Sequence, residues 1–295
     1  MNSLLGEFTK KLGDRWASLL ALPGLLWLAA ASAAVTAGHA HAFDVGRLRD
    51  RLTAFVEDPA HRAAGTALLL IAAVLLGSAV VGQAMSAGGR FVVWWWDRAG
   101  GGWLSPARSS RRRRWTAHVR MADAPSATAA DIAKHSTRAD RICVVEPDRP
   151  FWIGDRVRAI HVRTLRIYHL DLTVTWPRLW LVLPETTQTA LARASEAWAA
   201  AARLYAWAVL YGLLAFAWYP ALLVAAAIAT TAQLRARRTT RDLADLTEAA
   251  VDVHYRELLE LLGRSPGAGL DPGHGPELTG WFRRTRWDPA SPLYE

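Results

Sequence analysis

The stretch FWIGDRVRAIHVRTLRIYHLDLTVTWPRLWLVLP, residues 151–184, lies between an arginine-rich region and the last hydrophobic block of the chain. In its first half Ile153, Val157 and Ile160 recur at the spacing of one helical face, and arginines occupy intervening positions. This pattern predicts an amphipathic helix with a cationic face. The rest of the chain is organised around these residues, which we call the central stretch.

The second half of the central stretch is ambiguous between helix and strand. Residues 170–176 alternate as in a β-strand, but Asp171 also suits the capping position before a helix. We favour a helix. Pro177 and Pro184 are expected to bend the chain along a membrane surface, so that residues 150–196 form a cytoplasmic collar.

The hydrophobic residues of the 295-residue chain are gathered into long blocks instead of being spread along amphipathic elements. Blocks of about 20 residues are typical of membrane-spanning helices. The mean hydropathy of only +0.08 implies a large polar part in addition. The predicted fold class is all-α, a four-helix transmembrane protein with a mainly helical cytoplasmic part. The four predicted spans are residues 17–37, 63–84, 197–217 and 221–234.

Two of these assignments have alternatives. Lys10 and Lys11 before the first apolar run, with Ala-His-Ala at residues 40–42, would also suit a cleaved signal peptide. The apolar run is longer than the apolar core of a usual signal peptide and further spans follow, so a retained helix is favoured. Residues 218–220, Trp-Tyr-Pro, predict the turn of a hairpin between the last two spans. A single long tilted helix or a re-entrant pair is the alternative there.

Positive charge sets the predicted orientation. The net charge of +9 comes almost wholly from arginine, because Lys10, Lys11 and Lys134 are the lysines of the chain. The arginine run at residues 111–114 follows the second span, and residues 235–238 carry three more arginines after the fourth. Arginine accumulates on the cytoplasmic side of membrane proteins. We therefore expect a multi-pass plasma-membrane protein with both termini in the cytoplasm.

The remaining segments complete the predicted organisation. Apolar periodicity predicts an interfacial amphipathic helix near the N-terminus and a second amphipathic helix, ended by Gly263, near the C-terminus. That second helix should pack on the collar or on a partner subunit. The predicted segments are an interfacial helix at 1–16, an outside loop with a short helix at 38–62, a basic cytoplasmic linker at 85–149 with a modest helix around 128–139, an amphipathic helix at 239–263 and a tail at 264–295, of which 278–284 could dock.

One set of residues is predicted to contact lipid or a partner, and a second set is predicted to pack between helices. Tryptophan suits the lipid headgroup layer, and arginine suits anionic lipid or an acidic protein partner. The predicted lipid or partner contacts are Trp94, Trp95, Trp96, Arg111, Arg112, Arg113, Arg114, Arg156, Arg158, Arg163, Arg166, Trp176, Arg178 and Trp180. Small side chains let helices approach closely, and the predicted packing positions are Ser78, Gly82, Ala225 and Ala229.

Motifs for phosphate-cradling loops, metal centres and activated nucleophiles are absent from the sequence. Cys143, the one cysteine, excludes an internal disulfide and is expected to be a buried apolar residue. His39 and His41 with Asp44 are a conceivable metal site, but an interfacial loop explains them better. We expect no metal and no cofactor.

Acid–base pairing between an aspartate and a histidine is the sharpest enzyme hypothesis that the sequence offers. The candidates are Asp155, Asp171, His161, His169 and His254. Helix capping and pairing with arginine account for these residues better than catalysis does. The four predicted spans contain no Asp, Glu or Lys, which disfavours an ion-coupled transporter. The chain is therefore not expected to be an enzyme.

The central stretch resembles a family of uncharacterised, multi-spanning bacterial membrane proteins that are frequent in actinobacteria. The family shares a proline before a GD/GN-x-hR segment, then LD, then WPRLW-x-LLP, a hydrophobic hairpin and an amphipathic helix. The matching residues are Pro150, Gly154, Asp155, Arg158, Ala159, Leu170, Asp171, Trp176, Pro177, Arg178, Leu179, Trp180, Leu183 and Pro184, with further similarity at 22–26 and 278–279. The resemblance implies a bacterial inner-membrane location and brings no activity.

The expected function is that of an integral membrane anchor or adapter, whose arginine-rich cytoplasmic part meets a protein partner or anionic lipid. An oligomeric pore or membrane-perturbing effector is the alternative, suggested by the small residues on the second and fourth spans. Nucleic acid is not an expected partner, because no aromatic stripe or known binding fold accompanies the arginine run. The expected partners are thus membrane lipid and either another protein or further copies of the chain.

Overall fold

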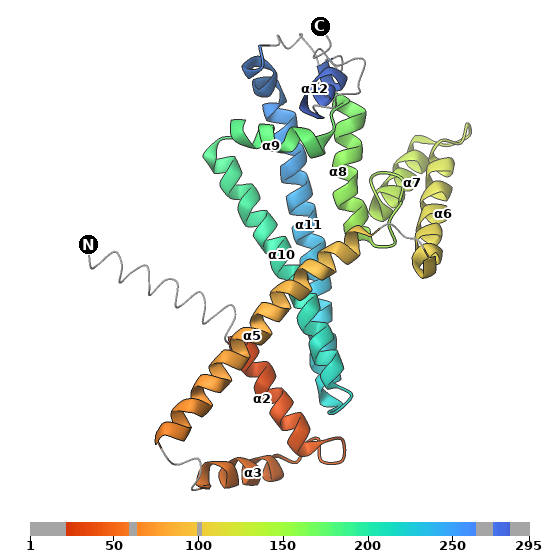
Figure 1. Cartoon of the computed structure of the whole chain (residues 1–295). Helices are drawn as coiled ribbons and strands as arrows, with labels where there is room; N and C mark the ends of the chain where they lie inside the picture. Colours follow the sequence, from red (N-terminus) through yellow and green to blue (C-terminus); the bar gives the residue numbers. More distant parts are fainter. Residues whose placement is uncertain (1–21, 59–63, 99–101, 264–273, 284–295) are drawn as a thin grey trace, which may run out of the picture. The chain divides into compact units, whose positions relative to one another are not determined.

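A computed structural model describes residues 22–58, 64–98, 102–263 and 274–283. The described chain is all-α, and no strand occurs within these ranges. The chain divides into two compact units (Figure 1), which we call unit 1, Met1–Val93 with Ala199–Leu234, and unit 2, Trp94–Trp198 with Arg235–Glu295. The predicted interfacial helix at 1–16 lies outside the described residues.

Unit 1 contains the most apolar helices of the chain. It holds α2, Leu22–Ala37, and α3, Val45–Glu57, together with the first part of α5, Ala64–Asp97. It also holds the end of α10, Glu185–Leu214, and the start of α11, Pro220–Leu261. Asp44 caps α3 by accepting a hydrogen bond from the Arg47 N–H at 2.9 Å. The boundaries between the units thus fall within α5, α10 and α11.

Small residues bring the helices of unit 1 close together. A Cβ on Gly24 of α2 would lie 2.3 Å from the Ser78 carbonyl oxygen of α5, and Ser78 itself is fully buried. A Cβ on Gly88 of α5 would lie 2.9 Å from the Ala206 Cβ of α10. Glycine is therefore required where α5 crosses these two neighbours. Gly82 and Ala225 are buried as well, and Ala229 is half-buried.

The chain turns between α10 and α11. Residues 215–219 link the two helices through consecutive turn hydrogen bonds, and the Tyr205 hydroxyl bonds the Gln233 side chain across the pair. The α2–α3 loop packs on this turn, because the Trp218 Nε1–H donates to the Ala42 carbonyl at 2.9 Å and His39 bonds the Phe216 carbonyl at 2.8 Å. Residues 197–234 therefore form a hairpin and not one long helix (Figure 1).

Two of the described helices, Gly65–Asp97 and Glu185–Leu214, are long and apolar enough to cross a membrane. Leu22–Ala37 is a shorter apolar helix, and the apolar start of α11 continues without a break into a charged segment. Large side chains along α5 are exposed, among them Leu68, Leu69 and Ile71. Exposed apolar side chains at this density suit a lipid environment better than water.

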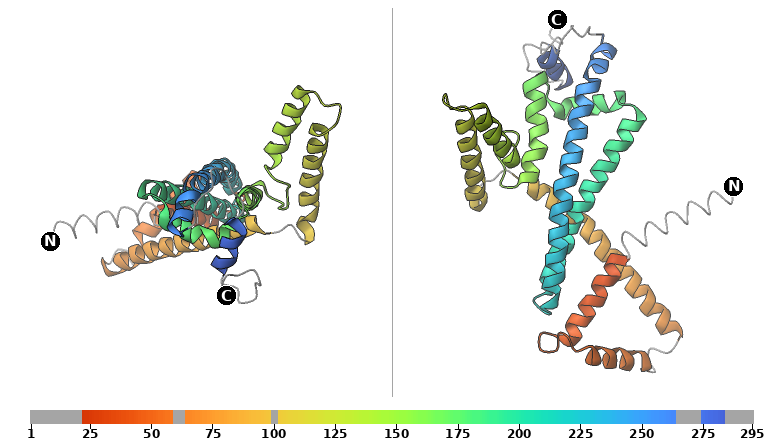
Figure 2. Two further views of the ribbon diagram at one scale, coloured as in Figure 1. Left: turned by 90° about the horizontal axis from the view of Figure 1, so that it is seen from above. Right: turned by 180° about the vertical axis from the view of Figure 1, so that it is seen from behind.

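Unit 2 begins with a helical hairpin where the sequence predicts a basic linker. Residues 105–122 form α6 and residues 129–142 form α7 (Figure 2), which stand to one side of α8. The sequence predicts a modest helix around residues 128–139 within this linker, which agrees with α7, whereas α6 is not predicted. Thr128 and Asp131 form a reciprocal capping box that starts α7. The His118 and His135 Nδ1 atoms lie 3.1 Å apart across the hairpin.

The core of unit 2 lies where the central stretch meets the C-terminal helices. It is built from α8, Trp152–Tyr168, α9, Leu172–Val182, the second part of α11 and α12, His274–Arg283. The Tyr168 hydroxyl donates to Asp252 at 2.7 Å, and its ring packs against Tyr255. The other buried core residues are Ile160, Leu170, Leu172, Leu179, Leu183, Leu191, Ala244, Ala250, Val251, Leu258, Leu259, Leu278 and Phe282. The predicted packing of the C-terminal helix on the collar is therefore confirmed.

The second half of the central stretch is helical, as predicted, and forms α9. The Asp171 side chain accepts a hydrogen bond from the Thr173 N–H at 2.9 Å and caps α9. Pro177 lies inside α9, so the first of the two prolines does not end the helix. The residues predicted as a span at 221–234 and as a separate helix at 239–263 belong to one 42-residue helix, α11. No Gly or Pro between them interrupts the hydrogen-bond ladder.

Gly154, at the start of α8, makes a very close contact with the end of α5. A Cβ there would lie 2.0 Å from the Trp96 carbonyl oxygen. We expect Gly154→Ala to lower the free energy of unfolding by about 1–3 kcal/mol, because α8 would have to move away from the end of α5. Gly212→Ala is the matched control, since no atom lies within 4 Å of its Cβ position. Thermal unfolding in detergent checks both variants; equal melting temperatures would contradict the contact.

Candidate functional site

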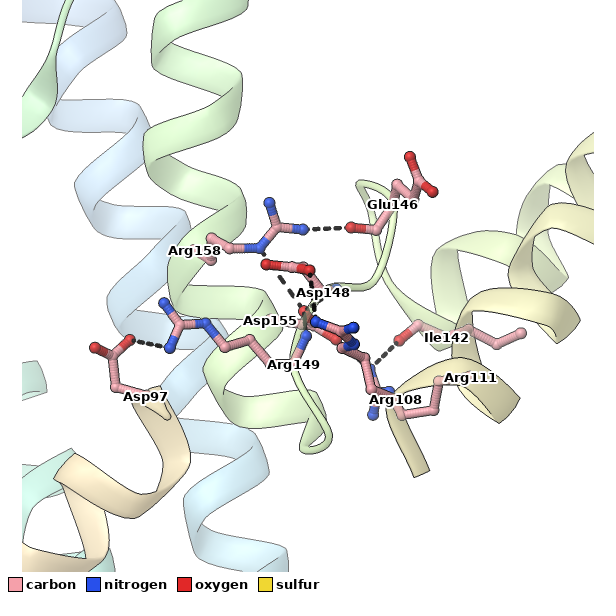
Figure 3. A network of polar contacts seen from close by, with 9 residues as sticks. All are labelled: Asp97, Arg108, Arg111, Ile142, Glu146, Asp148, Arg149, Asp155 and Arg158. Atoms are coloured by element: carbon pink, nitrogen blue, oxygen red, sulfur yellow. Dashed lines mark hydrogen bonds and ion pairs between the residues drawn. The ribbon is translucent and has the colours of Figure 1, made fainter. Parts of the chain in front are cut away.

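The candidate site surrounds Asp155, a carboxylate in the first turn of α8 that is 0% exposed. The backbone N–H groups of Asp148 and Arg149 donate to its Oδ1 at 2.9 and 2.8 Å. The Arg111 guanidinium on α6 donates to its Oδ2 at 2.8 Å and to the Ile142 carbonyl at 3.1 Å. One carboxylate therefore joins α6, α8 and the loop between α7 and α8 (Figure 3).

Burial and hydrogen-bond partners have opposite effects on the pKa of the Asp155 carboxyl. Burial raises the pKa of the Asp155 carboxyl, while the two backbone N–H donors and the charges of Arg111 and Arg158 oppose that rise. A buried carboxylate with three donors is suited to holding structure. It has little freedom to exchange a proton with a substrate.

Further ion pairs spread outward from Asp155 (Figure 3). Arg149 lies 3.2 Å from Asp97 at the end of α5, and Arg108 lies 3.6 Å from Asp148. Arg158 donates to the Glu146 carbonyl, and its Nε lies 3.8 Å from Asp155. Contacts to the α7–α8 loop thus hold Arg108 and Arg158, and Asp97 holds the guanidinium of Arg149, which lies in that loop.

The opposite side of α8 carries a second network. Arg156 bonds Asp245 at 2.6 Å and Glu248 at 2.7 Å, and Arg163 bonds Glu248 at 2.5 Å. Arg156 is almost fully buried, so its two carboxylate partners on α11 compensate for the loss of hydration. These pairs attach α8 to α11.

Two cavities of unit 2 share Arg158 with the Asp155 network, and another, of about 410 Å³, lies beside Arg156. The larger, of about 430 Å³, is lined by Arg149, Arg158, Arg283 and His161 together with two carboxylates and an apolar wall. The smaller, of about 210 Å³, is lined by Arg112, Arg158 and Arg166 beside Glu146 and Asp148. Arg158 contributes to both cavities.

The predicted contact residues divide into exposed and structural groups. Arg113 and Arg166 are exposed, and neither has an ion pair or hydrogen bond among the described residues. Trp94 is also exposed, and Arg98 stacks over its ring at 4.9 Å. Trp96 instead is buried and packs against Trp198 with ring centroids 6.0 Å apart.

The other members of the predicted set take part in packing and pairing. Arg112 pairs with Glu146 at 2.5 Å, Arg114 bonds Ser110, and Arg178 bonds the Val174 carbonyl and lies over the Phe282 ring. Trp95 lies beside the Trp103 ring. Trp176 and Trp180 pack against the core of unit 2. Arg111, Arg156, Arg158 and Arg163 belong to the two networks described above.

The acid–base candidates do not assemble into one centre. Asp155 is occupied by its network, and His254 bonds Glu257 at 2.8 Å. His161 and Asp171 line the same cavity, but the Asp171 carboxylate is held by Arg283 at 2.7 Å. Within the described ranges, no group of three His, Cys, Asp or Glu side chains has a geometry that could hold a metal ion. Cys143 is buried as predicted.

Several features of the site were not predicted from the sequence. The pairing of Arg111 with Asp155 links residues 44 positions apart, and no local pattern signals it. Arg283 on α12 bonds Asp171, 112 positions away in the sequence, and this contact also has no local signal. Comparison with protein-family models, with curated proteins and with solved structures finds no match to this chain. Any functional conclusion therefore rests on the geometry.

Replacing Asp155 tests whether the network is structural. Asp155→Asn would leave the partly buried Arg111 charge unpaired, and we expect a loss of about 3 kcal/mol in the free energy of unfolding. Asp140→Asn is the matched control, because Asp140 is exposed on α7 and its replacement should change stability by less than about 0.5 kcal/mol. Thermal unfolding followed by tryptophan fluorescence measures both; two indistinguishable variants would contradict a buried ion pair.

Proposed function

We propose that the protein is a non-enzymatic, multi-pass anchor in a bacterial plasma membrane. In this proposal unit 2 faces the cytoplasm and its arginines bind an anionic partner, either lipid or an acidic protein surface. The single observation that carries the proposal is the joining of two membrane-length helices to a folded unit with its own core and arginine-lined cavities.

Membrane insertion is supported by the helices of unit 1. Besides the two helices of sufficient length, α2 is apolar along its 16 described residues, and the start of α11 forms a hairpin with α10. Four spans with both termini inside would place the arginines that follow α5 and those at residues 235–238 on one side. That is the arrangement expected from the distribution of arginine.

The contacts of the arginines in unit 2 support the proposal that the partner is anionic. Arg149 and Arg158 are fixed through the loop bonded to Asp155, and each guanidinium has more N–H donors than its intramolecular contacts use. Arg113 and Arg166 add exposed charge without local partners in the described chain. Preorganised guanidinium groups favour phosphate and carboxylate over uncharged ligands.

The pore alternative receives less support from the packing. It requires small-residue faces that are free to meet other copies of the chain. Ser78 instead packs against Gly24 of the same chain, and Ala225 is buried. We therefore favour the anchor.

Cysteine labelling tests the proposed topology. The native Cys143 is 2% exposed, and burial raises the pKa of its thiol, so background labelling should be low. In spheroplasts a membrane-impermeant maleimide should label Thr53→Cys in α3 and Phe216→Cys in the turn. It should label Arg113→Cys only after permeabilisation.

Two results would contradict the proposal. Labelling of Arg113→Cys in intact spheroplasts would contradict the proposed orientation, and release of the protein from membranes by alkaline carbonate would exclude integral insertion. The double variant with Cys143→Ala is the control for signal from the native thiol.

A further inference from the structure

The larger cavity of unit 2 gathers cations from three separate elements. Arg149 comes from the loop before α8, Arg158 from α8 itself and Arg283 from α12. We infer that this cavity of about 430 Å³ binds a phosphate monoester group attached to a short apolar stem. The inference rests on the proposed function and specifies the anion that unit 2 takes.

The arginines have capacity for such a ligand. Arg149 uses one nitrogen on Asp97 at 3.2 Å, and Arg283 uses one on Asp171 at 2.7 Å. Each guanidinium carries five N–H donors, so several are left for an incoming anion. Phosphate offers three oxygens to donors arriving from different directions, whereas a carboxylate offers two in one plane. Three arginines from different elements that line one cavity therefore match a phosphate group better.

Asp97 lines the cavity and pairs with Arg149, so it would compete with the ligand for this arginine. Its side chain is 68% exposed and that of Arg149 is 18% exposed, so the solvent around the carboxylate weakens the pair. A dianionic phosphate can therefore displace it from Arg149. Asp171 is held more firmly, because it also caps α9 through the Thr173 N–H. The N-terminus of α9 is thus already satisfied, and the arginines supply the attraction.

The rest of the cavity wall indicates what the phosphate is attached to. Val157, Val162, Leu165 and Leu172 line it beside the charged groups. The volume lies within the roughly 300–1,000 Å³ typical of small-ligand sites, which leaves room for more than a free phosphate ion. An amphiphilic phosphate monoester satisfies both the cationic and the apolar part of the wall.

Chain connectivity favours a lipid as the source of this group. Asp97 on the cavity wall is the last residue of α5, and α5 is one of the two membrane-length helices. The exposed Trp94 lies three residues before it, in a sequence of tryptophans that suits the headgroup layer. A soluble phosphomonoester has the same recognition chemistry, so the experiment must separate the two sources.

The test measures ligand binding to the full-length protein in detergent by microscale thermophoresis. The probes are short-chain phosphatidic acid, a phosphate monoester, and short-chain phosphatidylglycerol, a diester, with glycerol 3-phosphate as the soluble monoester. We expect phosphatidic acid to bind about tenfold more tightly than phosphatidylglycerol, the equivalent of one charge-assisted hydrogen bond. Competition by glycerol 3-phosphate at similar concentration would assign the site to a soluble ligand, whereas weak competition would assign it to lipid.

Variants with opposite expected effects make the test specific. Arg283→Gln and Arg149→Gln should each weaken phosphatidic acid binding about tenfold, because each removes a charged donor. Asp97→Asn should strengthen binding by about threefold, since it removes the competing carboxylate. Arg256→Gln, an exposed arginine of α11 away from the cavity, is the matched control. A misfolded sample would not gain affinity on loss of Asp97, and binding driven by net charge alone would weaken as much in Arg256→Gln as in Arg283→Gln.

Two outcomes would overturn the site. One is equal affinity for the monoester and the diester in the unmodified protein; the other is an Arg283→Gln variant that melts normally and binds phosphatidic acid as before. Both leave the membrane anchor intact, because topology labelling and carbonate extraction measure that independently. Conversely, a peripheral protein that still prefers the monoester would retain the site and remove the anchor.

Discussion

The buried carboxylate of Asp155 is the interaction on which unit 2 depends. A charge that is 0% exposed is tolerated only when donors surround it, and here two backbone N–H groups and Arg111 do so. The same bonds shape the α7–α8 loop, which in turn orients Arg149 and Arg158. The cationic surface of this unit is therefore a consequence of how one acid is buried.

Helix α8 carries charged networks on two sides, and this explains its high arginine content. Arg156 and Arg163 hold the carboxylates of α11, whereas Arg158 lies with Asp155 toward the α7–α8 loop. Apolar residues such as Ile160 fill the space between the helices. The amphipathic pattern of the central stretch thus describes a helix that is packed on several sides, and only part of its arginine is available to a ligand.

Sequence patterns predict the helices and turns of the fold better than the long-range contacts between them. The helical spacing of the central stretch, the capping role of Asp171 and the turn before Pro220 are local, and the structure agrees with each. The arginine run of α6 lacks an apolar face, so the sequence indicates a linker there, although it predicts a modest helix around residues 128–139, where α7 lies. These helices are stabilised by distant contacts, such as the Trp115 Nε1–H bond to the Cys143 carbonyl at 2.9 Å. The cavity could not be predicted, because Arg283 reaches it from the far end of the chain.

The preference for arginine over lysine has a consequence for control of the protein. Lys134 on α7 is the one lysine among the described residues, so nearly all fixed positive charge there is carried by guanidinium groups. Guanidinium stays protonated at any physiological pH, and lysine acetylation can remove only one of these charges. Changes of pH and lysine acetylation therefore leave nearly all of this positive charge in place. The same lysine offers a single point of attachment for amine-directed dyes on the α6–α7 hairpin.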